Sequence, residues 1–370
     1  MEKIQLKDVL DVKRGASLSG EYYSTSGELI RLTLGNFNYP DCGWKENKSK
    51  EDIYFTGQVR KEFILQEGDI ITPLTEQVRG LLGNTATIPE SNKYIQSGDI
   101  GLIIPNEEKI DKRYSYYLIS STVVKKQLDA GSQQTKIRHT SPDSIKNCYA
   151  YILEREEQVK VACLLDSINK KIEINNSIND NLQQMIYDTY MYNFLHKEPN
   201  GILSDIIIEN PKSKTQVKDV KGQAGLYPFF TSGESIMKSN KYIIDGRNIF
   251  MNTGGNADVK FYIGKADYST DTWCITTNNN LTDYLYLHLL SIKSELNTKF
   301  FKGTGLKHLQ KDLLRNKEIY IPSIKEIEAF NLISKPYFDK ISDNYRENEH
   351  LIQIRNYLLP LLMNGQISIT

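Results

Sequence analysis

Residues 154–194 read EREEQVKVACLLDSINKKIEINNSINDNLQQMIYDTYMYNF, a stretch that contains neither Pro nor Gly. Apolar residues that alternate by four and three positions are typical of a coiled coil. The stretch therefore predicts a helix of about 40 residues, roughly 60 Å long, that pairs with another helix. The expected stripe comprises Val161, Leu165, Ile168, Ile172, Asn175, Asn179, Leu182, Ile186 and Thr189.

A second copy of this pattern follows at the end of the chain, 169 residues later. No gap is needed to align residues 114–194 with their shifted counterparts, which indicates a duplication. Identical pairs under the shift include Tyr117/Tyr286, His139/His308, Asp143/Asp312, Tyr151/Tyr320, Asn175/Asn344 and Asn179/Asn348. The second stripe is weaker, and Pro336 predicts a kink in its first turns.

Both stripes carry two asparagines at equivalent positions. A buried Asn lowers stability but fixes the register and the partner of a helix pair. The alternative is that these asparagines face solvent. On the first interpretation the helices pair through Ile168, Ile172, Asn175, Asn179, Leu182, Ile341, Asn344, Asn348 and Leu351.

The regions before each helix consist of short apolar runs separated by Gly, Pro, Asn and Asp, with one short helical segment each, which predicts mixed domains. The expected fold class is α+β. Two mixed α/β domains stand in a pseudo-two-fold arrangement and are separated by two long antiparallel coiled-coil helices. The expected boundaries are 1–153 for the first domain, 154–196 for the central helix, 197–322 for the second domain and 323–370 for the C-terminal helix.

The composition narrows the functional classes. The 46 Lys and Arg residues balance 46 Asp and Glu residues, although residues 197–322 are modestly basic, with 17 against 13. Such a chain is less basic than a protein that binds DNA by phosphate attraction alone. The four cysteines are scattered, no apolar run approaches the roughly 20 residues of a membrane span, and the start lacks a signal-peptide pattern. We therefore expect a cytoplasmic protein that contacts no membrane and holds no metal.

Several loops mix small polar residues, aromatics and cations. Asn, Gln, Arg and Lys side chains read base edges, and Gly lets the backbone approach phosphate. For each such residue the alternative is an ordinary turn with a solvated cation. The candidate DNA-binding residues are Arg14, Arg31, Asn36, Arg79, Asn84, Lys136, Arg138, Thr231, Ser232, Arg247, Asn252, Thr253, Gly254, Lys260, Tyr262 and Lys307.

Catalytic motifs are missing from the sequence. No strand is followed by a glycine-rich nucleotide fingerprint, and no P-loop, HExxH or GxSxG occurs. Asn210-Pro211 continues into Lys212, unlike the motif of adenine methylases. A nuclease-like string, Asp41 followed by Glu46 and Lys48, is too short to favour catalysis. We expect no catalytic residue, and we interpret His139 and His308 as structural.

The repeated T-x-[IL]-[KR]-H-x₃-D pattern, together with the long helices, resembles the specificity subunits of Type I restriction–modification systems. The strings GTGLKHLQ at 303–310, YPFFTSGE at 227–234, NTGG at 252–255 and DTW at 271–273 are similar to those of that family. The first half departs from it, because QQTK at 133–136 stands where the family often has glycine.

This resemblance implies a non-catalytic subunit that reads a bipartite site in double-stranded DNA, one half per domain. It implies two adenine methyltransferase subunits and restriction/translocase subunits as partners. S-adenosylmethionine, ATP and Mg would be used by those partners, and this chain would bind no cofactor. Two alternatives stay open: a DNA enzyme, either a nuclease or a fused methyltransferase, and a coiled-coil scaffold protein without a nucleic-acid role.

Overall fold

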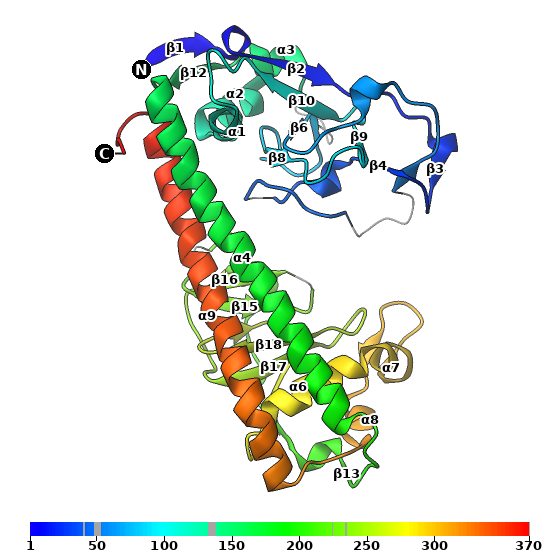
Figure 1. The fold of residues 1–370 in the computed structure, drawn as a ribbon. Coiled ribbons are helices and arrows are strands. Elements are labelled where there is room, and N and C mark those ends of the chain that lie inside the picture. Colours follow the sequence, from blue (N-terminus) through cyan, green and yellow to red (C-terminus); the bar gives the residue numbers. More distant parts are fainter. Residues whose placement is uncertain (40, 48–52, 132–137, 224, 234, 370) are drawn as a thin grey trace. The chain divides into compact units, whose positions relative to one another are not determined.

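The computed structural model describes residues 1–39, 41–47, 53–131, 138–223, 225–233 and 235–369. The chain divides into two compact units. The first unit comprises Met1–Ile172 and Glu349–Thr370, and the second comprises Glu173–Asn348. Each unit therefore combines one globular domain with a part of each of the two long helices, α4 (Arg155–Phe194) and α9 (Ile324–Met363) (Figure 1).

The first domain is built on an antiparallel sheet with the strand order β2-β10-β6-β8. Val12, Ile70 and Ile103 pack into one core, and Ile71 and Ile100 pack into another. The sheet is therefore buried on both faces, so its strands read as apolar runs rather than as strict alternation. The strands are β2 (Leu10–Arg14), β10 (Ile100–Pro105), β6 (Ile70–Pro73) and β8 (Ala86–Thr87).

A smaller sheet, β3-β5-β4-β9, covers the second of these cores, and its β4 and β9 are parallel. Its strands are β3 (Tyr23–Ser24), β5 (Tyr54–Phe55), β4 (Leu29–Arg31) and β9 (Tyr94–Ile95). Two strand pairs complete the domain: β1 (Glu2–Gln5) with β12 (Tyr149–Ile152), and β7 (Thr75–Glu76) with β11 (Arg138–His139). Its α-helices are α1 (Lys112–Ile119), α2 (Thr122–Gly131) and α3 (Pro142–Lys146), and its 3-10 turns are Leu6–Asp8, Gly20–Tyr22, Leu34–Asn36 and Lys61–Phe63.

The second domain repeats this topology. Its main sheet has the order β14-β20-β17-β18, and its smaller sheet, β16-β15-β19, again contains one parallel pair. The strands are β13 (Gly201–Ile202), β14 (Ile207–Glu209), β15 (Tyr227–Phe230), β16 (Ile236–Ser239), β17 (Arg247–Asn252), β18 (Val259–Ile263), β19 (Asp267–Tyr268), β20 (Thr272–Thr277), β21 (Phe301–Lys302), β22 (His308–Leu309) and β23 (Glu318–Ile319). The helices are α5 (Val217–Val220), α6 (Thr282–Ser291), α7 (Lys293–Glu295) and α8 (Lys311–Arg315), with short turns at Leu203–Asp205 and Leu296–Phe300.

The predicted duplication is evident in the bounds of the helices. Adding 169 to the bounds of α3 gives those of α8, Lys311–Arg315, and the same shift converts α4 into α9. Helix α9 continues through Pro336, where the sequence predicts a kink. The fold is thus two copies of one mixed domain, each followed in the chain by a helix of 40 residues.

Within the second unit, the two long helices meet through their asparagines. Asn175 Nδ2 donates to Asn348 Oδ1 at 2.9 Å, and Asn344 Nδ2 donates to Asn179 Oδ1 at 2.8 Å. Residue numbers rise along α4 while they fall along α9, so the helices are antiparallel there. All four asparagines are buried. Among the described residues, Asn179 Nδ2 and Asn344 Oδ1 lack a partner, so this layer lowers stability while it restricts the register.

Within the first unit, the same two helices pair through a different set of side chains. Val161 and Leu165 of α4 share a core with Leu362 and Met363 of α9. Arg355, which is 8% exposed, donates through Nη1 to Asn169 Oδ1 at 3.1 Å. The pairing is antiparallel in this unit as well, since the beginning of α4 lies against the end of α9.

Candidate nucleic-acid interface

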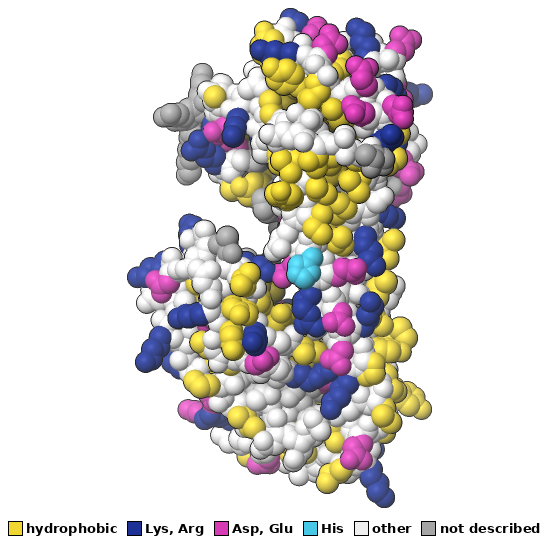
Figure 2. Space-filling view, turned by 90° about the vertical axis from the view of Figure 1, so that its left-hand side faces the viewer, with side chains coloured by type: hydrophobic (Ala, Val, Ile, Leu, Met, Phe, Trp, Pro, Cys, Tyr) yellow, Lys and Arg dark blue, Asp and Glu magenta, His cyan; other side chains and the backbone are white. Residues whose placement is uncertain are grey.

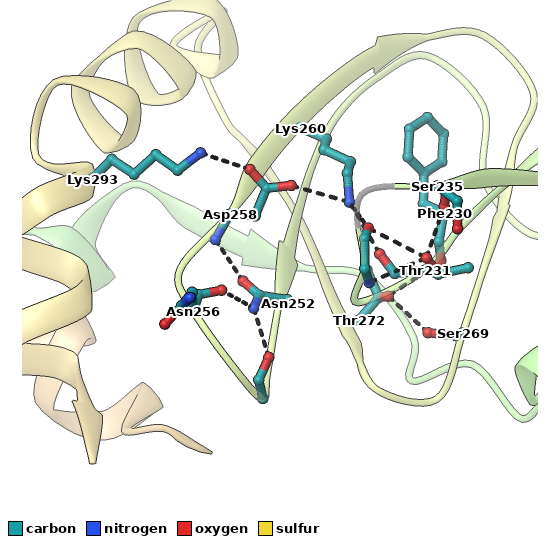
Figure 3. Close-up of polar contacts among 12 residues, drawn as sticks. Phe230, Thr231, Ser235, Asn252, Asn256, Asp258, Lys260, Ser269, Thr272 and Lys293 are labelled. Carbon is teal, nitrogen blue, oxygen red and sulfur yellow. Dashed lines mark hydrogen bonds and ion pairs between the residues drawn. The ribbon is translucent and has the colours of Figure 1, made fainter. Parts of the chain in front are cut away.

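Lys260 on β18 ties together two loops of the second domain. Its Nζ donates to the carbonyl of Thr231 at 3.2 Å, bonds the carbonyl of Gly233, and lies 3.2 Å from a carboxylate oxygen of Asp258 (Figure 3). Lys293 approaches the other oxygen of Asp258 at 2.9 Å. Burial opposes the charge on Asp258, but these two ammonium groups outweigh it and lower the pKa of that carboxyl. The ammonium of Lys260 thus has three partners inside the protein.

Asn252, at the end of β17, closes the loop that follows it. Its Oδ1 accepts the backbone N–H of Asp258 at 2.7 Å, and its Nδ2 donates to the carbonyls of Gly254, at 2.7 Å, and Asn256 (Figure 3). This buried amide thus satisfies three backbone groups of its own loop. The sequence proposes Asn252 as a base reader, whereas the structure gives its side chain internal partners.

Other candidates in this domain are also engaged internally. Thr231 Oγ1 donates to the carbonyl of Ser235 at 2.8 Å, and Thr253 Oγ1 donates to that of Asp271 at 2.9 Å. The Tyr262 ring lies 5.6 Å from that of Phe230. The backbone of Gly254 bridges His308, Ser232 is half-buried, and Lys307 is exposed. The contacts of Thr231, Thr253 and Gly254 thus brace these loops.

Arg247 lies at the opposite end of β17 from Asn252. Its guanidinium bonds both carboxylate oxygens of Asp283 on α6, at 2.8 and 3.0 Å, and also reaches Asp339 on α9. Burial raises the pKa of Asp283, although Arg247 opposes the shift. The group therefore ties β17 to two helices of its unit, so its role as a DNA contact, which the sequence suggests, has to compete with these ion pairs.

The candidates of the first domain separate into three groups. Asn36 and Asn84 are buried: Asn36 accepts the N–H of Thr33 at 2.9 Å, and Asn84 Oδ1 bonds Lys125. Arg79 and Arg138 are paired with carboxylates. Arg14 and Arg31 line a cavity of about 630 Å³. Lys136 lies outside the described residues.

The partners of Arg79 and Arg138 include Glu76, which the sequence patterns do not single out. Arg138 bonds Glu76 at 2.9 Å and Asp129 at 2.6 Å, and Arg79 bonds Asp129 at 2.6 Å. These two guanidinium groups lower the pKa of Asp129. Glu76 is 1% exposed. The available sequence signal is a Glu that follows the short apolar run at 70–74 and precedes a turn with Gly80.

The nuclease-like string is described only in part. Asp41 bonds Arg355 of α9 at 3.1 Å, and Lys48 lies outside the described residues. No cluster of three or more His, Cys, Asp or Glu residues suited to a metal ion occurs in the described part of the chain. None of the helices described here contains an apolar stretch of the length that crossing a bilayer requires.

On the face seen in Figure 2, charged side chains are spread out rather than gathered in one patch. Figure 2 shows Lys and Arg side chains scattered over the face of each unit, with acidic and apolar side chains between them. In the second domain Lys212 and Lys214 are exposed on the segment that follows β14. Lys311 lies over the Trp273 ring, 4.9 Å from its centre, and burial together with Lys212 lowers the pKa of its ammonium group.

The duplicated mixed domain on an antiparallel helix pair matches one known family. The model of the Type I restriction modification DNA specificity domain matches residues 1–184 and again residues 202–347. The chain therefore belongs to this family, as the resemblance of its sequence strings implies.

Individual relatives agree with the family. The specificity subunit of the Type I restriction enzyme MjaVIII from Methanocaldococcus jannaschii is 26% identical over 189 residues, which cover 50% of this chain and 43% of the relative. The HindI specificity subunit from Haemophilus influenzae is 36% identical over 90 residues, which cover 23% of this chain and 19% of the relative. The match thus spans less than half the length of either relative.

A solved structure has the same fold along the whole chain. The S subunit of a Type I restriction–modification system from M. genitalium is 13% identical, with a TM-score of 0.62. The similarity covers 100% of this chain and 96% of that one. At this identity the similarity concerns the fold.

Proposed function

We propose that this chain is the DNA-reading subunit of a Type I restriction–modification complex and recognises a bipartite site, one half per domain. The observation that carries the proposal is the duplication itself. The two domains share one strand order. The carboxylate of Glu76 closes a loop of the first domain, whereas the amide of Asn252 closes the equivalent loop of the second. A conserved scaffold with different loops suits one task performed on two different targets.

The chain acts without catalysis and without a cofactor of its own. Its partners are two adenine methyltransferase subunits, which use S-adenosylmethionine, and restriction/translocase subunits, which use ATP and Mg. The complex works on double-stranded DNA in the cytoplasm. The family match and the similarity of the fold support this proposal, and the relatives named above are themselves specificity subunits.

The experiment tests whether the chain recognises DNA without transferring a methyl group itself. The chain is purified alone and together with a co-expressed methyltransferase of the adenine type, and each sample receives labelled S-adenosylmethionine and a library of random duplexes. We expect methyl transfer only with the partner, at a motif with two fixed halves and a constant gap. Methyl transfer by the chain alone would support the alternative of a fused methyltransferase, and a partnered complex without any preferred motif would contradict the proposal.

A further inference from the structure

The turn that follows β7 in the first domain is closed by one buried carboxylate. Oε2 of Glu76 accepts the backbone N–H groups of Gly80 at 3.0 Å, Leu81 at 2.9 Å and Leu82 at 3.0 Å. Hydrogen bonds to an ionised acceptor are about twice as strong as neutral ones, and each of these amides would otherwise need another partner. The path of residues 77–82 is therefore fixed by Glu76.

A second set of bonds holds the same turn from the neighbouring strand. Arg138, paired with Glu76 in the β7–β11 ladder, donates to Glu76 Oε1 at 2.9 Å. Arg79 donates through two nitrogens to Asp129, at 2.6 and 3.1 Å. The turn is thus anchored at both ends, and Gln77 and Val78 between these anchors are exposed, Val78 by 59%.

Gln77 lines the cavity of about 630 Å³ that also contains Arg14 and Arg31. Arg14 donates to the carbonyl of Thr140 at 3.4 Å, and the guanidinium of Arg31 lies 4.0 Å from the centre of the Tyr23 ring. Among the described residues, the side-chain amide of Gln77 makes no hydrogen bond. The cavity thus has an unengaged amide on a fixed turn and two guanidinium groups in its lining. An amide of this kind reads base edges, and guanidinium groups hold phosphates.

We propose that Gln77 is a specificity-determining residue that reads an adenine at one position of one half-site, and that Glu76 is the positioning residue that holds it. This inference rests on the proposed function. Gln forms a bidentate pair with N6 and N7 of adenine in the major groove, which the other bases do not offer. Arg14 and Arg31, at the same cavity, contact the sugar–phosphate backbone beside that base.

The test uses the assembled complex, full chain with its methyltransferase partner, and the same library of random duplexes. In Gln77→Ala we expect the preference for adenine at one position to fall roughly 10- to 100-fold, with the other half-site unchanged. In Gln77→Arg the preference at that position should move to guanine, because Arg pairs with O6 and N7 of guanine. The matched control is Gln58→Ala, an exposed Gln of the same domain outside the cavity, which should leave the motif unchanged.

The outcomes distinguish this inference from the proposed function. If the wild-type complex selects no bipartite motif, the proposed function itself fails. If the wild type selects one and both Gln77 variants select the same one, Gln77 does not read a base. A loss spread evenly over all positions would show that Gln77 contacts the backbone instead, and would also overturn the inference.

The positioning role of Glu76 has its own readout. Glu76→Gln keeps an acceptor for the turn but removes the charge that holds Arg138. We expect it to weaken the adenine preference at the Gln77 position although Gln77 is intact, with the second half-site preserved. A Glu76→Gln complex that is less stable to heat but keeps the full preference at this position would show that Glu76 is only structural.

Discussion

The two domains close equivalent loops with different chemistry. In the first domain, the loop that follows β6 and β7 is held by the carboxylate of Glu76. This carboxylate accepts three backbone N–H groups and pairs with Arg138. In the second domain the loop after β17 is held by a neutral amide, Asn252, that both donates and accepts. The strands β6 and β17 occupy the same place in sheets of the same order.

The comparison shows that the two copies share their scaffold and differ in the side chains that close the loops. The order of the strands is kept, and the bounds of α3 and α4 recur in α8 and α9, because the cores and the helix pair depend on them. The loop closures diverge freely, since any group that satisfies the same backbone amides and carbonyls keeps the scaffold folded.

The largest effect is expected from the shared helices. We insert one extra heptad after Ile172 in α4 alone, which shifts one part of α4 along α9 by seven residues. Either Asn175 and Asn179 then lose their partners in α9, or the contacts between the two helices in the first unit are lost. We expect cooperative unfolding to be lost, as measured by thermal denaturation. The matched control adds a second heptad after Asn348 in α9, which restores the seam.

The doubly lengthened protein also tests whether the length of the helices sets the distance between the two half-sites. Seven residues add about 10 Å of helix, which corresponds to about 3 base pairs of B-DNA. Selection from the duplex library should return both half-sites with a gap longer by that amount. An active complex with an unchanged gap would show that the helices do not set the distance.

The loop closures should differ in strength. Glu76→Ala leaves buried amides unpaired and removes a partner of Arg138, which we expect to destabilise the first unit by about 3–5 kcal/mol. Asn252→Ala removes a neutral group, which we expect to destabilise the second unit by about 1–3 kcal/mol. The two tryptophans report the units separately, because Trp44 lies in the first and Trp273 in the second. Urea unfolding followed by fluorescence in W273F and W44F backgrounds measures each value.

The same variants decide between two interpretations of Asn252. If Asn252→Ala leaves the second unit fully stable and relaxes a single base position in the assembled complex, its amide reads DNA after all. If the unit is destabilised and the motif keeps its pattern, the amide braces the loop. Lys260→Ala, which removes the tie between two loops, should behave as Asn252→Ala does.

The helices and the duplication could be predicted from the sequence because they leave a periodic signal. The seam positions follow the heptad, and His139 and His308 mark the constant shift. The side-chain directions in the loops leave no such signal. The sequence does not distinguish an Asn whose amide faces solvent from one whose amide bonds the backbone of its own loop. The Asn-x-Gly-Gly string after an apolar strand nevertheless favours a turn that the Asn side chain closes.

Arg247 illustrates a further limit. A cation in a strand that is otherwise apolar looks available for a ligand, and only the fold brings Asp283 and Asp339 to it from two helices. Glu76 was missed for the converse reason. A carboxylate argues against a DNA surface, and its role depends on three amides that the turn directs at it.

The last prediction concerns one interior position, and its effect should appear only in acid. In the second unit Tyr190 Oη lies 2.9 Å from His288 Nδ1, whereas the 169-residue shift places Leu359 and Ile119 at these positions in the first unit. Burial lowers the pKa of His288 to about 4, with a further contribution from Lys317. In the unfolded chain the group titrates near 6.5, so the unfolded state binds more protons between these values.

The stability that a neutral His288 contributes is therefore complete above pH 6.5 and declines as the pH falls toward 4. The difference amounts to roughly 3 kcal/mol at the acid end. Because carboxyl groups titrate over part of the same range, the informative quantity is the difference between the wild type and Tyr190→Leu/His288→Ile, which carries the residues of the first unit. Urea unfolding followed by Trp273 fluorescence at pH 7 and pH 4.5, in a W44F background, should show a smaller acid loss in the double variant. An equal loss in both proteins would mean that His288 is protonated in the folded chain and that the two units do not differ in acid at this position.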